Sequence, residues 1–176
     1  MSASFYDISV PVFIRALTNL SAILDKGAAH AEGEGKVPES LMDARLHPDM
    51  HALAYQVQRA SDATRFFVAR IAGIDNPPME DKETTFPELK ARIAATIAYL
   101  ETVPRERIDG KEKIDVELKT PRATILFKGL PYLLEFALPN LFFHVTTAYA
   151  LLRHQGVPVG KMDFIGPVTR KEPVLA

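Results

Sequence analysis

The sequence predicts an all-α four-helix bundle with a short β-hairpin inserted before the last helix. Four segments carry apolar residues at three- and four-residue steps, which is the spacing of one helix face. Between residues 114 and 127 apolar and polar residues alternate instead, which is typical of strands with one buried face. The chain has 176 residues, 47% of them apolar, which suits one domain with its own core.

The first two helices are expected over residues 5–31 and 48–73. Pro11 lies early in the first segment, so this helix either begins or bends there, and the glycines of AEGEGK end it. Pro48 suits the first turn of the second helix, because proline lacks the N–H that has no partner at that position. Asp49 next to it would favour the positive end of the helix dipole.

The third helix, expected over residues 86–103, has the clearest start signal. Thr85 and Glu88 have the spacing of a capping box, in which each side chain accepts a hydrogen bond from the other residue's backbone N–H. Pro104 is expected to end this helix.

A β-hairpin is expected next, with strands at residues 114–118 and 123–127. One face of the hairpin is apolar and is predicted to lean on the helices: Ile114, Val116, Leu118, Ala123, Ile125 and Phe127. The fourth helix is expected over residues 130–155, kinked or split at Pro139.

The last twenty residues, VPVGKMDFIGPVTRKEPVLA, contain three prolines and show no sustained period. We expect them to be extended, with Phe164 and Ile165 in contact with the bundle. The chain is therefore predicted to form one domain over residues 1–166, followed by a C-terminal tail over 167–176.

Charge and composition exclude several classes of protein. The 21 lysines and arginines against 22 aspartates and glutamates give a net charge of −1, whereas nucleic-acid binding usually needs a basic surplus. The absence of cysteine excludes disulfides, zinc–thiolate sites and a cysteine nucleophile. No run approaches the ~20 apolar residues that span a bilayer, and the N-terminus does not resemble a signal sequence. We expect a cytoplasmic protein that binds neither nucleic acid nor membranes.

Histidines are the main candidates for chemistry, because the chain lacks G-x-S-x-G, P-loop, G-x-G-x-x-G and H-E-x-x-H motifs. His144 lies on the apolar stripe of its helix, one turn after Asn140. Such a histidine is either a hydrogen-bonded part of the core or a ligand or catalyst. His51 lies on the flank of the second apolar stripe, on the side of Gln58 and Asp62.

Three segments carry a resemblance to a known family. They are SFYDISVPVFIRALTNLSAILDKGAAHAE, DKETTFPELKARIA and FALPNLFFHVTTAYALLRHQGVPVGKMDFIG. Together they resemble a bacterial family of unknown function that is grouped with the DinB/YfiT-like superfamily, over nearly the whole chain to about Gly166. The resemblance implies a DinB/YfiT-like four-helix bundle, commonly a homodimer, which agrees with the periodicity.

The resemblance also implies a metal site. Members of that superfamily hold a divalent metal with one histidine of the second helix and an H-x-x-x-H pair of the last helix, and some use it to activate a low-molecular-weight thiol. Their last-helix pattern continues to L-R-x-x-G, which matches residues 152–156. Counting back places His144 at the second histidine of the pair and Asn140 at the first. His51 is the better match for the second-helix ligand and His47 the weaker one.

Asparagine at the first position of the pair weakens this implied site, because a neutral amide oxygen is a poor ligand for zinc or nickel beside imidazole. We therefore expect a degenerate metal site of His51, Asn140 and His144. No cofactor is expected beyond a weakly bound divalent metal such as Zn or Ni.

Three functions stay open. The first is an uncharacterised, non-enzymatic, dimeric bundle with a degenerate pocket. The second is a divalent-metal-dependent transferase or hydrolase, with an open metal position for water or thiol. The third is a small-molecule binding module, and the candidate pocket-lining residues are Tyr55, Asp62 and Tyr149. The sequence does not decide whether the chain is an enzyme.

Overall fold

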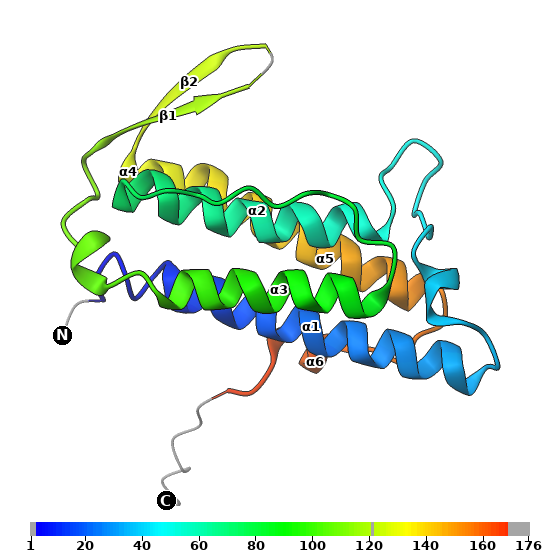
Figure 1. The fold of residues 1–176 in the computed structure, drawn as a ribbon. Helices are drawn as coiled ribbons and strands as arrows, with labels where there is room; N and C mark the ends of the chain where they lie inside the picture. Colours follow the sequence, from blue (N-terminus) through cyan, green and yellow to red (C-terminus); the bar gives the residue numbers. More distant parts are fainter. Residues whose placement is uncertain (1–2, 121, 169–176) are drawn as a thin grey trace, which may run out of the picture.

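Four long helical segments lie side by side in a bundle (Figure 1). This computed structural model describes residues 3–120 and 122–168. The three uninterrupted helices are α1 (Val10–Gly33), α2 (Leu53–Ala72) and α3 (Phe86–Glu101). The fourth segment consists of α4 (Gly129–Pro131), a π-helical stretch (Tyr132–Ala137) and α5 (Leu138–His154). The shorter elements are 3₁₀ turns at Pro38–Leu41 and Arg105–Arg107, strands β1 (Asp115–Lys119) and β2 (Thr124–Lys128), and α6 (Lys161–Ile165).

The predicted four-helix bundle with a hairpin before the last helix is confirmed. Helices α1 and α2 each pack against both α3 and α5, so the apolar stripes meet at the centre of the bundle. Side chains buried there from all four segments include Leu17, Leu24, Val57, Phe67, Ile93, Leu141 and Leu151. Among the described residues, no helix combines the length and apolar character needed to cross a membrane.

Helix α1 begins later than the periodicity predicted. It starts at Val10 rather than at residue 5, and Pro11 occupies its first turn. The hydroxyl of Ser9 donates a hydrogen bond of 2.7 Å to the carbonyl of Phe5, so the preceding residues form a turn of their own. The apolar residues of that turn still reach the core, and Phe5 is buried. The apolar periodicity therefore extends towards the N-terminus beyond the first residue of the helix.

The predicted start of the second helix at residue 48 is wrong, because α2 begins at Leu53. Side chains hold the preceding residues in a loop. Arg45 donates to the carbonyl of Met50 at 2.5 Å, and Gln56 donates to the carbonyl of His51 at 2.9 Å. These bonds satisfy carbonyl groups outside the helix, and they place His51 in the loop that leads into α2.

Helix α3 begins where the capping box predicted. Thr85 accepts from the N–H of Glu88 at 3.3 Å, and the carboxylate of Glu88 accepts from the N–H of Thr85 at 3.0 Å. The helix ends at Glu101, two residues before the expected end.

The fourth helical segment is disturbed next to Pro139, as predicted. The disturbance is the π-helical stretch, which lies immediately before α5, and Pro139 occupies the first turn of α5. Because a proline ring clashes with the carbonyl four residues earlier, a wider turn at that point relieves the conflict.

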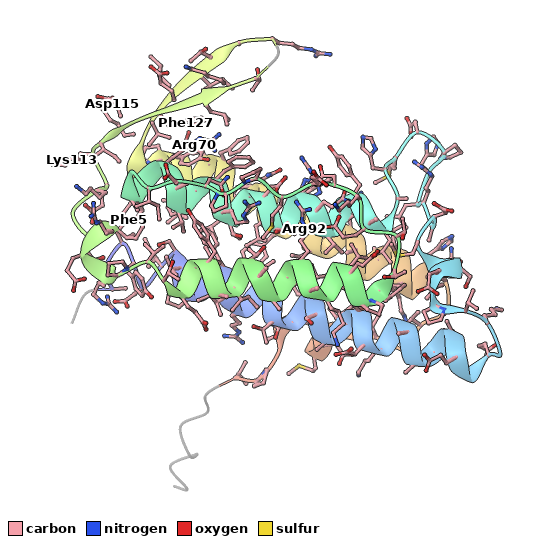
Figure 2. All side chains as sticks on the ribbon, viewed as in Figure 1. Phe5, Arg70, Arg92, Lys113, Asp115 and Phe127 are labelled. Carbon is pink, nitrogen blue, oxygen red and sulfur yellow. The ribbon has the colours of Figure 1, made fainter. Side chains whose placement is uncertain are left out.

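The hairpin is antiparallel, and Val116 pairs with Phe127 and Leu118 with Ile125. Its base packs on the bundle, where the Phe127 ring lies 5.7 Å from that of Tyr132 (Figure 2). The rest of the hairpin projects away from the bundle on the side of α2 (Figure 1). The expectation that the whole apolar face of the hairpin leans on the helices is therefore wrong for Ala123 and Ile125, which are exposed near the free end.

The segment after α5 is more ordered than the extended tail that the prolines predicted. Val157 and Val159 are buried in the core, and the short helix α6 packs against α1. Phe164 packs against the core, as expected. Most of the predicted tail, residues 169–176, lies outside the described residues.

Candidate functional site

His144 lies on α5 where this helix packs against α2, and 9% of its surface is exposed. Asn140 lies one turn earlier on the same helix and is half-buried. Residues four apart share a face of a helix, so the two α5 residues that the family pattern paired lie on the same side.

Gln56 of α2 determines the tautomer of His144. The amide nitrogen of Gln56 donates to the carbonyl of His51, so the amide oxygen Oε1 is the atom that faces His144. Oε1 lies 2.8 Å from Nδ1 of His144. Because a carbonyl oxygen can only accept a hydrogen bond, Nδ1 carries the proton. Nε2 of His144 therefore keeps its lone pair, and it has no hydrogen-bond partner among the described residues.

Burial, together with the smaller effect of the charges of Arg59 and His51, lowers the pKa of His144 to about 4. The imidazole is therefore neutral near pH 7. Its Nε2 can accept a hydrogen bond or bind a metal ion. It is a weak base, however, because an efficient general base has a pKa near the working pH. This nitrogen is suited to accepting a hydrogen bond from a ligand.

Aromatic rings surround His144 on its solvent side. The Tyr55 ring meets the His144 ring edge-on, with centroids 6.1 Å apart, and the exposed His51 ring stacks on Tyr55 at 3.8 Å. Phe143 approaches from α5 at 5.2 Å and is 58% exposed. We call His51, Tyr55 and Phe143 the aromatic rim.

Asp62 belongs to a different polar cluster on α2, which faces α3. Its carboxylate pairs with Arg65 at 3.3 Å and with Arg92 of α3 at 2.9 Å. Arg92, which lies between the two helices in Figure 2, also pairs with Glu83 at 2.9 Å. We call Asp62, Arg65, Glu83 and Arg92 the ion network.

The two arginines of the ion network are buried, its two carboxylates are partly buried, and its charges balance. The side chain of Arg92 is 2% exposed. Burial opposes both charges of the Arg92–Glu83 pair, but hydrogen bonds and nearby opposite charges outweigh it, so the pKa of Arg92 is raised and that of Glu83 is lowered. Both residues line an open cavity of about 540 Å³ between α3 and the loop before it, and His144 does not line this cavity. Asp62 therefore forms ion pairs with the buried Arg65 and Arg92, in a cluster separate from His144.

Arg59 connects the two clusters. Its guanidinium lies 5.2 Å from the centre of the Tyr55 ring. The same group pairs with Asp62 at 3.0 Å and with Asp81 of the loop before α3. A residue in contact with the rim is thus tied to the loop that covers the ion network.

Tyr149 lies away from both clusters. Its hydroxyl is 3.5 Å from the carbonyl of Val159, and its ring meets Phe164 of α6 edge-on at 6.1 Å. The three predicted pocket residues are therefore in three places: Tyr55 beside His144, Asp62 in the ion network, and Tyr149 beside α6.

The donor set around His144 does not fit a tightly held zinc or nickel ion. His144 offers one imidazole nitrogen, and Asn140 offers a neutral amide. His51 lies in the loop with its ring stacked on Tyr55. Within residues 3–120 and 122–168, no three histidine, aspartate or glutamate side chains gather in a way that could hold a metal ion. We therefore derive no reaction step through a metal at this site.

The sequence reasoning missed Gln56, which makes the contact that orients His144. A signal for it was present. Gln56 follows Leu53 by three residues and precedes Ala60 by four, which places a polar side chain on the buried stripe of α2. Buried amides are nearly always hydrogen-bonded, so a polar side chain at this position predicts a polar partner on a facing helix.

Comparison with known proteins agrees with the fold. The chain matches the family described as "Domain of unknown function (DUF1993)" over residues 5–165. It is also similar to the crystal structure of a DinB family member protein from Shewanella denitrificans, with 40% sequence identity and a TM-score of 0.88, covering 96% of this chain and 95% of that chain. No curated protein matches. The chain therefore belongs to the DUF1993 family, a domain of unknown function with the DinB-like bundle fold.

Proposed function

We propose that this DUF1993 protein is a small-molecule-binding bundle whose site is centred on Nε2 of His144. The observation that carries the proposal is the pairing of His144 with Gln56, which leaves Nε2 neutral, oriented and without a partner among the described residues. Nε2 is open to solvent, so water or a ligand can donate a hydrogen bond to it. The aromatic rim would supply the apolar contacts.

The charges nearby indicate a neutral ligand. Arg59 is the cation next to the rim, and its charge is already matched by Asp62 and Asp81. Nε2 of His144 can receive a hydroxyl, an amide N–H or a thiol S–H. The proposed ligand is therefore a neutral molecule that presents such a donor beside a flat or apolar body.

The first test measures the protonation of His144 by NMR of its side-chain nitrogens at pH 7. We expect the neutral Nδ1–H tautomer, and an Nε2–H tautomer would contradict the proposal. The second test is a thermal-shift screen of neutral metabolites and low-molecular-weight thiols. Compounds that raise the melting temperature of the native chain should not do so for His144→Phe. If no compound separates the two proteins, the binding proposal fails.

A divalent-metal-dependent transferase or hydrolase is the second candidate, and one observation favours it. Histidine ligands of metals usually donate their second N–H to an oxygen acceptor, and Gln56 plays that part for His144. Elemental analysis of protein purified without an affinity tag decides between the two. Less than about a tenth of an equivalent of Zn, Ni, Mn or Fe would remove this candidate, and a full equivalent would replace the first proposal.

We also propose that the protein is a homodimer. Exposed apolar side chains on the hairpin and the π-helical stretch support this, with Leu126 71% and Leu134 52% exposed. Light scattering on the full chain should give twice the mass of 19.5 kDa. The Leu126→Lys variant should lower that mass, whereas Thr124→Lys on the same face of β2 should not. A monomeric native chain would contradict the proposal.

A further inference from the structure

A second cavity, of about 270 Å³, lies between α1, α5 and α6. Its lining is mostly apolar and comes from all three helices: Val12, Arg15, Ala16, Asn19, Phe142, Val145, Phe164 and Ile165. Phe142 and His144 differ by two positions on α5, which is about 200° around a helix. The cavity therefore lies on the opposite side of α5 from the site proposed above.

Arg15 supplies the charge at this cavity. Its Nη2 donates to the carbonyls of Ile165 at 2.8 Å and of Pro167 at 2.9 Å. These two bonds fix the guanidinium in place but leave its charge unmatched, because carbonyl groups are neutral. In the described part of the chain, no carboxylate pairs with Arg15, and its Nη1 and Nε have no acceptor. The cavity thus combines an apolar interior with a positioned cation at its edge.

Helix α6 covers the cavity, and two polar contacts link it to α1. Asn19 donates to the carbonyl of Phe164 at 3.0 Å, and Lys26 pairs with Asp163 at 2.7 Å. Gly166 follows in the left-handed region and passes so close to Asn19 that a side chain there would collide with it. The Phe164 ring contacts that of Phe142, with centroids 6.5 Å apart, so two aromatic rings meet at the cavity.

We propose that this cavity binds a small monocarboxylate with an apolar body, with its carboxylate on Arg15 and its body between Phe142 and Phe164. Guanidinium groups donate strong charge-assisted hydrogen bonds to carboxylates, and the Nη1–H and Nε–H groups of Arg15 are left for such bonds because Nη2 donates to the two carbonyls. The apolar lining favours a hydrocarbon chain or a ring over a polar anion such as phosphate. This ligand class differs from the neutral one proposed for His144, so the two sites can be tested separately.

The test is calorimetric titration of the full chain with hexanoate, and with hexanol as the uncharged counterpart. Hexanol cannot form the hydrogen-bonded charge pair with Arg15, so it should bind roughly tenfold or more weakly than hexanoate. Butanoate lacks two methylenes and should bind roughly tenfold more weakly than hexanoate. Equal affinities for hexanoate and hexanol, or no binding of hexanoate, would overturn the proposal.

Variants then locate the site. Arg15→Gln should weaken hexanoate binding by roughly tenfold or more, while Arg153→Gln, at the exposed end of α5, should leave it unchanged. Val12→Phe should fill the cavity from its half-buried edge and block hexanoate, with thermal unfolding as the check that the bundle is intact. If Arg15→Gln and Val12→Phe both bind hexanoate like the native chain, the cavity is not the site. Hexanoate should also bind His144→Phe normally, which separates this site from that of the proposed function.

Discussion

Helix α2 carries two polar clusters that differ in how their polar groups are satisfied. In the ion network, Arg92 meets Asp62 and Glu83 within 2.9 Å, and the charges of the network balance. Beside α5, Gln56 binds one nitrogen of His144, and the other nitrogen has no partner among the described residues. Nε of Arg92 is buried and has no hydrogen-bond partner among the described residues, whereas Nε2 of His144 is open to solvent. The two clusters therefore differ in solvent access and not only in pairing.

The difference shows which cluster has capacity for a ligand. Nε of Arg92 is closed to solvent and therefore to a ligand, whereas Nε2 of His144 is open to solvent and can exchange a water molecule for a donor group of a ligand. The ion network therefore serves to hold α2, α3 and the loop between them together. The His144 cluster is the one that can change its partners. Substitutions in the two clusters should accordingly have effects of different size and kind.

The largest effect is expected from Arg92→Met. This change removes the buried cation that pairs with both Asp62 and Glu83, so the free energy of unfolding should fall by about 3–5 kcal/mol. Urea unfolding measures it, and Arg107→Met on the exposed 3₁₀ turn is the matched control, with a change within about 0.5 kcal/mol. A loss below about 1 kcal/mol for Arg92→Met would mean that the network does not hold the loop.

The next effect is the pH dependence that His144 imposes. Its pKa is 6.5 in an ordinary setting and about 4 in the fold, so between these values the unfolded chain binds more protons than the folded chain. The contribution of neutral His144 to the free energy of unfolding is therefore fully present above pH 6.5. It is lost as the pH is lowered towards 4, and the loss from this group is at most about 3 kcal/mol. The double variant Gln56→Leu/His144→Phe should lose less stability than the native chain over the same window. Parallel curves for the two proteins would contradict the assignment.

The fold could be predicted because its signals are local. The capping box of Thr85 and Glu88 placed the start of α3 correctly, and the alternation around Val116 located the hairpin. The start of α2 could not be read in this way. Its position depends on Arg45 and Gln56, whose side chains bind carbonyls of the preceding loop, and apolar periodicity does not report such bonds.

The candidate site was predicted in part for a related reason. His144 was singled out because it is a polar residue on an apolar stripe, and its burial is confirmed. Its partner Gln56 lies 88 residues away on α2. Helical spacing marks Gln56 as a buried polar residue, but it does not say which side chain of a facing helix bonds to it. Helical spacing placed Asp62 on the same flank as His51, but α3 attracts that carboxylate through Arg92. In both cases a side chain on a neighbouring helix determined the outcome: Gln56 for His144 and Arg92 for Asp62.

A smaller effect is expected from Gln56→Leu. The variant leaves the Nδ1–H of His144 without an acceptor, which should cost about 1–3 kcal/mol of unfolding free energy. Gln155→Leu, at the exposed end of α5, is the matched control and should change little. NMR of the His144 nitrogens should also show the Nε2–H tautomer gaining population. If the tautomer is unchanged, Gln56 does not orient this ring.

The smallest effect is expected from His51→Ala, at the exposed edge of the aromatic rim. His51 is exposed and stacks on Tyr55 from the loop, so its removal should change the free energy of unfolding by no more than about 0.5 kcal/mol. Ligand binding at His144 should weaken in the same variant, because the ring lost is one wall of the site. This separation of binding from stability is what distinguishes the rim from the ion network. A stability loss as large as that of Arg92→Met would show that both clusters hold the fold, and the contrast between them would fail.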